Sequence, residues 1–198
     1  MPQKKEPIPI GKGMTAVVRA SELRKIDNRR SERMKDVPER AGWYRWWAPK
    51  AVLERLLNDD MKELWSHLQE GTFEGKPYFY IYVGITHSSL QDRLNWHVNQ
   101  KHSESAVRTR YLSTLRQSIS SLVDGNQKVW VKTNDLIDKL LIEYRVTDNP
   151  IEDENKELEN YVLPLNIQKN KKGPAESFIR YLKKVRKEAR EKALEEYA

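Results

Sequence analysis

Three polar side chains of different chemistry lie close together in the stretch from Pro77 to Val98. They are the phenol of Tyr82, the guanidinium of Arg93 and the imidazole of His97. Arg93 and His97 are four residues apart, so on a helix they would project from one side. A guanidinium is permanently charged and forks onto phosphate oxygens, while a phenol and an imidazole can exchange protons. Together these groups suit chemistry on a phosphate ester.

The sequence around these groups predicts a strand that runs into a short helix. Residues 78–85 are aromatic and β-branched, which is typical of a buried strand. Ser88 or Ser89 then provides a helix N-cap, and apolar residues follow at helical spacing at Leu90, Leu94 and Val98. The strand would carry the phenol, and the helix would carry the guanidinium and the imidazole.

The rest of the chain predicts two more strands with helices around them. Residues 42–47 and 140–147 have the composition of strands. An amphipathic helix is expected over residues 49–68, between the first strand and the second. Other helices are expected over residues 21–37, over residues 111–122 with Gly125 as its end, from Asp148 or Asn149 up to Pro164, and from Ala175 to the C-terminus. Three strands flanked by helices make an α/β (α+β) fold.

The positive charge is concentrated at the two ends of the chain. Residues 1–40 hold 11 Lys and Arg against 6 Asp and Glu, and residues 169–198 hold 10 against 5, whereas residues 41–168 hold 15 against 18. Basic ends on one domain suit a polyanion, because each neutralised phosphate releases counterions. The alternative is that these Lys and Arg residues only solvate surface helices.

Composition excludes several other kinds of site. The 198 residues suit one packed domain, and the lack of cysteine excludes disulfides, thiolate zinc sites and a cysteine nucleophile. The four histidines form no HExxH pair, so a histidine-based zinc site is not expected. No apolar segment follows Lys5, and no stretch is apolar enough to span a membrane, so we expect a cytoplasmic protein.

Four short motifs, in this order, resemble those of the GIY-YIG nuclease family over residues 41–168. They are Gly42-Trp43-Tyr44, Tyr82-Val83-Gly84, the pair Arg93 and His97, and a helical Glu154 followed by Pro164 and Asn166. The family has a small three-stranded antiparallel sheet with flanking helices, and it cleaves DNA phosphodiesters with a divalent metal. The resemblance implies such a fold here, with an inserted helix and basic terminal extensions.

The resemblance also implies a role for each residue of these motifs. Tyr44 and Tyr82 would be the active-site tyrosines, and Arg93 would clamp a phosphate. His97 would transfer or orient a proton, so that either Tyr44 or His97 is the general base. Asn166 would support the site from behind the residues that touch the substrate.

Glu154 would hold the metal, which we expect to be Mg²⁺ or Mn²⁺. One carboxylate, a phosphate oxygen and waters can complete an octahedral Mg²⁺ site. Glu154 is three residues after Ile151 and four before Leu158, so it borders the apolar side of its helix. Glu157 is the rival ligand. Glu154 is preferred for this position and because it precedes Asn166 by twelve residues.

Each residue also has a purely structural interpretation, and the pattern departs from the family in three places. Strand tyrosines often fill cores, and acidic helix residues often only face solvent. Tyr44 and Tyr82 are 38 residues apart because residues 49–76 are inserted, Tyr82 to Arg93 is one residue longer than expected, and Ile85 stands where some members have Lys. We expect the insertion to read bases, since the core motifs contact phosphate.

The sequence thus predicts a basic N-terminal arm and helix (residues 1–40), a GIY-YIG-like catalytic domain (residues 41–168) and a basic C-terminal helix (residues 169–198). The expected function is metal-dependent cleavage of double-stranded DNA. We expect a type II restriction enzyme because the sequence leaves no room for the long C-terminal modules of homing enzymes or of the excision-repair nuclease subunit. A structure-selective repair nuclease and a catalytically silent nucleic-acid-binding module are the alternatives. Cleavage at a palindrome would require a homodimer.

Overall fold

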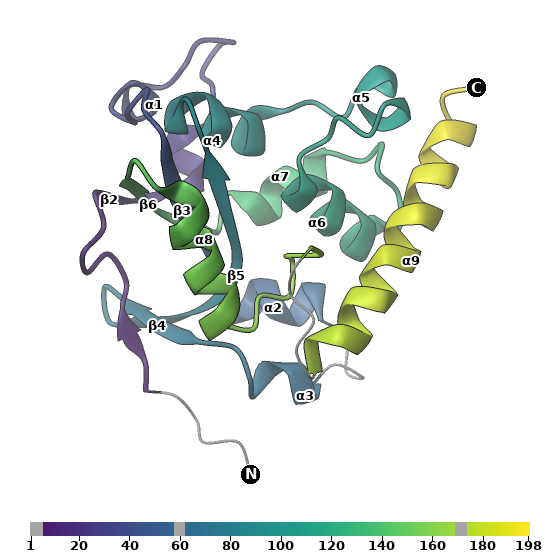
Figure 1. The fold of residues 1–198 in the computed structure, drawn as a ribbon. Helices are drawn as coiled ribbons and strands as arrows, with labels where there is room; N and C mark the ends of the chain where they lie inside the picture. The colour runs from purple at the N-terminus through teal and green to yellow at the C-terminus, as the bar shows by residue number, and fades with distance from the viewer. Residues whose placement is uncertain (1–5, 58–61, 169–173) are drawn as a thin grey trace.

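A six-stranded sheet forms the centre of the computed structural model, which describes residues 6–57, 62–168 and 174–198 (Figure 1). The strand order is β1-β4-β5-β3-β6-β2, and all neighbours are antiparallel except β1 and β4. The strands are β1 (Ile8–Pro9), β2 (Ala16–Arg19), β3 (Gly42–Pro49), β4 (Glu70–Phe73), β5 (Lys76–Thr86) and β6 (Leu141–Val146).

The three expected strands are β3, β5 and β6 and lie side by side, but the prediction of a three-stranded sheet is wrong. β2 pairs with β6, and β4 and β1 extend the sheet beyond β5. The turn between β4 and β5 has positive φ at Glu74 (50°) and Gly75 (73°), the conformation of a tight hairpin turn. Part of the insertion is therefore a strand of the sheet.

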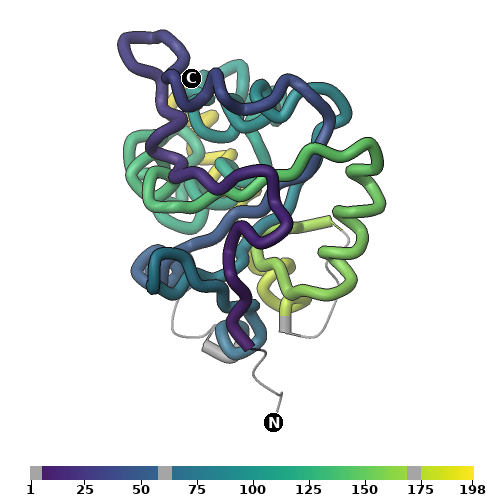
Figure 2. Tube along the Cα trace, turned by 90° about the vertical axis from the view of Figure 1, so that its left-hand side faces the viewer, coloured from purple at the N-terminus to yellow at the C-terminus, as the bar shows by residue number. Residues whose placement is uncertain are grey.

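The single helix expected over residues 21–37 does not form. Its place is taken by a 3₁₀ turn, η1 (Ala20–Leu23), and a short helix, α1 (Glu32–Lys35). Asp27 and Asn28 have φ of 50° and 63°, a left-handed conformation that Asp and Asn tolerate. They reverse the chain between η1 and α1. Figure 2 shows this N-terminal segment, in dark purple and blue, at the top of the view, where part of it loops out from the rest of the chain. Tertiary contacts have overridden helix propensity here.

The inserted segment forms α2 (Lys50–Leu56) and α3 (Lys62–Trp65) in place of one long helix. Leu57 is already extended, and residues 58–61 of the predicted helix lie outside the described part of the chain. Ser89 caps α4 (Leu90–Asn99), and Gly125, with φ of 56°, ends α6 (Thr114–Asp124), as the sequence predicts. The remaining helices are α5 (Glu104–Arg108), α7 (Val131–Ile137), α8 (Pro150–Asn160) and α9 (Pro174–Glu195).

Each face of the sheet carries an apolar cluster, and a β-bulge decides which face the tyrosines of β5 take. The register between β3 and β5 shifts so that Trp46 pairs with Tyr82 and Trp47 pairs with Tyr80. Tyr80 and Tyr82 therefore belong to opposite clusters although they are two residues apart. α8 packs on the Tyr80 side, whereas α4, α6 and α9 pack on the Tyr82 side. No described helix combines the length and apolarity needed to cross a bilayer.

Candidate active site

Tyr44 and His97 are hydrogen-bonded to each other at the centre of the site. The phenol oxygen lies 2.7 Å from His97 Nε2, and both side chains are buried. β3 supplies Tyr44 and pairs it with Gly84 of β5. Because Gly84 has no Cβ, the Tyr44 ring can lie against it, and an added Cβ would stand 2.4 Å from the phenol oxygen. The second tripeptide motif thus makes room for the tyrosine of the first.

Burial keeps both members of this pair neutral at pH 7. It lowers the pKa of His97 well below its ordinary value of 6.5, and the charges of Arg93 and Arg116 lower it further. It raises the pKa of Tyr44 well above 10, with Tyr82 and Glu154 adding to the effect and Arg93 opposing it. A neutral phenol and a neutral imidazole in direct contact can pass a proton between them.

Arg93 lies on α4, one turn before His97, and its charge acts on Tyr44, Tyr82 and His97. Its guanidinium carbon lies 4.9 Å from the centroid of the Trp96 ring. Within the described residues no carboxylate forms an ion pair with Arg93. Its positive charge lowers the pKa of Tyr44, Tyr82 and His97 relative to burial alone. The guanidinium therefore suits a phosphate next to the tyrosines.

Tyr82, Glu154 and Asn166 line one cleft of about 590 Å³. β5 brings Tyr82, and α8 brings Glu154. The opposite wall is α9, which contributes Lys183, Arg186, Lys187 and Arg190. Figure 1 shows α8 and α9 on opposite sides of the segment that follows α8. Burial raises the pKa of Tyr82 to about 12, with Arg93 opposing the shift and Glu154 adding to it.

Asn166 holds the edge of β5 that β4 leaves unpaired. Its side-chain oxygen accepts from the Val83 N–H, and its side-chain nitrogen donates to the Val83 carbonyl, both at 2.9 Å. The neighbouring Leu165 N–H donates to the Ile81 carbonyl at 3.1 Å. Asn166 thus replaces a strand at the residue between Tyr82 and Gly84, and it fixes the backbone that carries the second motif.

Glu157 lies on the other face of the sheet and is held by three hydrogen bonds. Arg45 donates to both of its carboxylate oxygens, at 2.8 and 2.6 Å, and Tyr80 donates to it at 2.8 Å. Arg45 also bonds Glu143 at 2.9 Å. Burial alone would lower the pKa of Arg45, but the carboxylates of Glu157 and Glu143 raise it overall. Glu157 therefore anchors α8 to the sheet, while Glu154, one turn earlier, lines the cleft.

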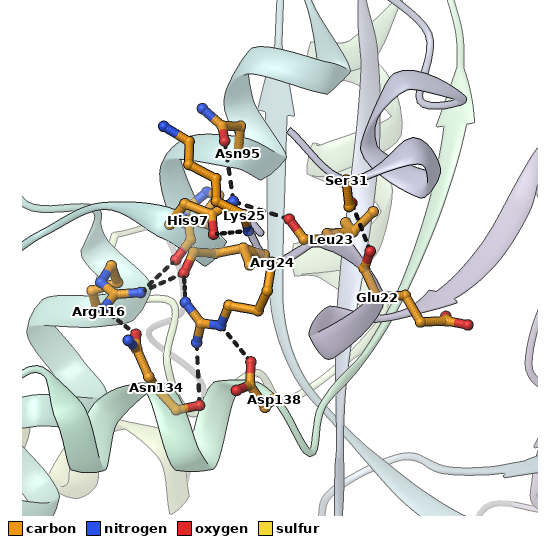
Figure 3. A network of polar contacts seen from close by, with 12 residues as sticks. Glu22, Leu23, Arg24, Lys25, Ser31, Asn95, His97, Arg116, Asn134 and Asp138 are labelled. Atoms are coloured by element: carbon orange, nitrogen blue, oxygen red, sulfur yellow. Dashed lines mark hydrogen bonds and ion pairs between the residues drawn. The ribbon is translucent and has the colours of Figure 1, made fainter. Parts of the chain in front are cut away.

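Two arginines that sequence reasoning missed hold the end of the helix that carries His97 (Figure 3). Arg116, fully buried in α6, donates to the carbonyls of His97 at 3.0 Å and Val98 at 2.9 Å. Arg24, after η1, also donates to the Val98 carbonyl, and it pairs with Asp138 at 2.5 Å. Cations at a helix C-terminus complement its exposed carbonyls. The sequence signal that could have identified Arg116 as a buried residue is its position on the apolar side of its helix.

A metal ion would depend on very few protein ligands. The described part of the chain holds no group of three or more His, Asp or Glu residues that could bind one. Among the described residues that line the cleft, Glu154 is the one carboxylate, and the volume of the cleft leaves room for waters. Divalent cations that prefer oxygen, such as Mg²⁺, use one or two carboxylates and complete their shell with water and phosphate. Such a cation fits this donor set.

Comparison with protein-family models gives a match to the GIY-YIG catalytic domain over residues 42–188. The match begins at β3 and extends into α9, so it includes α8 and three of the four cleft cations of α9, with Arg190 beyond its end. Comparisons with curated proteins and with solved structures returned no match. Domains of this kind imply nucleases, which are generally metal-dependent DNA endonucleases. This chain belongs to the GIY-YIG nuclease family.

Proposed function

We propose that this protein is a Mg²⁺-dependent DNA endonuclease of the type II restriction kind. The observation that carries the proposal is the charge of the cleft. Its described lining residues include one carboxylate, Glu154, and five cations, namely Arg110, Lys183, Arg186, Lys187 and Arg190. The cations suit the phosphates of a nucleic acid strand, and the carboxylate suits a divalent metal at the phosphate that is cut.

The residues of the two motifs and α4 would divide the reaction among them. Arg93 would neutralise the non-bridging phosphate oxygens, and Tyr82, a neutral phenol, would donate a hydrogen bond to the phosphate. The Tyr44–His97 pair would take the proton of the attacking water. Mg²⁺ at Glu154 would, when bound, offset the charge that develops on the phosphate.

The choice of a restriction enzyme is supported by the basic C-terminal helix, which contributes four cations to the cleft. α9 forms a wall of the cleft, while the described part of the N-terminal segment lies outside the cleft lining and binds the end of α4, the helix that carries Arg93 and His97. None of the described residues of the insertion, 49–57 and 62–76, lines the cleft. We therefore propose that base reading comes from α9 and from the residues between α5 and α6, in place of the insertion.

Cleavage of both strands at a palindrome requires two such clefts. We propose that two copies of the chain act together on DNA, in the cytoplasm. Sedimentation of the protein with and without its DNA tests this assembly. A monomer that makes double-strand breaks in one encounter would contradict it.

Incubation of the purified protein with supercoiled plasmid and Mg²⁺, followed by sequencing of the new ends, tests the function. Discrete fragments with a common end sequence are the expected result. Preferential cutting of flaps or branched oligonucleotides would favour a structure-selective repair nuclease instead. Binding without cleavage in both Mg²⁺ and Mn²⁺ would contradict the enzymatic proposal and favour a silent binding module.

A further inference from the structure

Tyr111 is an aromatic side chain that the fold leaves outside, with 68% of its surface exposed. It lies between α5 and α6, and its ring centroid is 5.6 Å from that of Trp96 on α4. The same Trp96 ring contacts the guanidinium of Arg93. An exposed ring therefore continues a row of contacts that starts at the residue proposed to hold the phosphate.

Hydrogen bonds on both sides hold the backbone of Tyr111 in place. Its N–H donates to the Ala106 carbonyl at 2.8 Å, and its carbonyl accepts from the Gln100 side chain at 2.9 Å. The preceding Arg110 has φ of 60°, a conformation that costs free energy for a residue other than glycine. The turn that holds Tyr111 also places Arg110 at the cleft. A ring on a backbone that is already ordered loses less conformational entropy when it binds a ligand than a ring on a disordered loop.

The surroundings of Tyr111 select a nucleobase as its partner. Arg110 precedes Tyr111 in the chain, Arg93 contacts the same Trp96 ring as Tyr111, and the cleft adds four cations from α9. Aromatic rings next to cations are the features that bind the bases and phosphates of an unpaired strand. Within a duplex each base face is covered by its neighbours, so only an unstacked base can use such a ring.

We propose that the exposed Tyr111 ring, supported from behind by Trp96, forms a stacking platform for an unstacked nucleobase next to the phosphate held by Arg93. This inference rests on the proposed function, because it needs a nucleic acid in the cleft. The base would come either from a nucleotide extruded from a duplex or from one that is already unpaired. Both sources present the same flat ring to the platform.

Fluorescence anisotropy with two labelled strands of equal length tests the platform, in EDTA so that no strand is cut. One strand is oligothymidine, and the other is an abasic phosphodiester strand with the same charges and no bases. The wild-type protein should bind oligothymidine about fivefold or more tightly than the abasic strand. Tyr111→Leu should lose this ratio and keep its affinity for the abasic strand, whereas Tyr111→Phe should keep the ratio.

Trp130→Leu is the matched control, because it removes another exposed aromatic ring, at the start of α7. It should leave the ratio unchanged. Equal affinity of the wild type for the two strands, or an equal loss on both strands in Tyr111→Leu, would overturn the platform and leave the proposed nuclease intact. Failure to bind either strand would also overturn the platform, whereas the plasmid assay tests the proposed nuclease independently.

Binding of the same variants to duplex DNA distinguishes the two sources of the base. If Tyr111→Leu weakens binding only to a duplex with one unpaired thymine, the platform receives a base that is already unpaired. If it also weakens binding to the fully paired duplex, the protein extrudes the base itself.

Discussion

The Tyr44 ring lies against the backbone of Gly84 so closely that a Cβ at residue 84 would stand 2.4 Å from the phenol oxygen. Tyr44 bonds His97 from this position. The two tripeptide motifs are therefore one structural unit, in which the last residue of the second provides the space for the phenol of the first.

Gly84→Ala should displace the Tyr44 ring, because the methyl group would also come within 2.8 Å of two ring carbons. We expect the free energy of unfolding in urea to fall by about 1–3 kcal/mol and plasmid nicking to fall about a hundredfold. Gly125→Ala is the control. It strains a turn with φ of 56° but meets no atom within 4 Å, so nicking should be unchanged. Normal nicking by Gly84→Ala would contradict this account of the motifs.

Arg45→Met should destabilise the protein strongly, since it leaves the buried carboxylates of Glu143 and Glu157 without their shared partner. Removing one member of a buried ion pair typically costs about 3–5 kcal/mol. Arg40→Met is the matched control, because Arg40 is exposed and its distance to Asp148 is 4.0 Å. Urea denaturation should show a change of about 1 kcal/mol or less for this control. Similar losses in the two variants would show that Arg45 does not anchor α8.

Two buried histidines should make the protein less stable in mild acid. Burial lowers the pKa of His97 well below 6.5, and burial together with Arg116 lowers the pKa of His102 to about 3. In the unfolded chain both titrate near 6.5, so below this pH the unfolded state binds more protons. The free energy of unfolding should fall by up to about 1.4 kcal/mol per pH unit for each histidine as the pH decreases below 6.5.

Urea denaturation between roughly pH 8 and pH 5 measures this slope, because most carboxylates stay ionised in that range. His102→Gln should reduce the slope, whereas His87→Asn, which changes an exposed imidazole, should keep it. A stability that is constant across this range would contradict the neutral, buried state of both histidines.

Local patterns predicted the centre of the fold, because its elements are long and carry their own signals. The strands β3, β5 and β6, the Ser89 cap of α4 and the Gly125 end of α6 are read from neighbouring residues. β1, β2 and β4 were missed because short strands gain their order from pairing with distant segments. The helix expected over residues 21–37 is lost for the same reason, since Arg24 is bound to α4.

The motifs also led to residues that the fold brings together, although their catalytic roles stay predictions. Tyr44 contacts His97, and Tyr82, Glu154 and Asn166 share the cleft. What the sequence could not show is how distant helices pack. The position of α9 as a wall of the cleft depends on long-range contacts. The different roles of Glu154 and Glu157 do so too, because Arg45 of a distant strand binds Glu157 and leaves Glu154 at the cleft.

Glu154 is proposed to serve a metal-dependent cleavage site, and plasmid nicking in Mg²⁺ by Glu154→Gln tests this role most directly. The substitution keeps the size of the side chain, and Glu152→Gln on the same helix changes an exposed carboxylate as a control. We predict a loss of about a thousandfold in rate for Glu154→Gln, with gel-shift binding retained and Glu152→Gln as active as the wild type. Full cleavage by Glu154→Gln in Mg²⁺ would contradict this role.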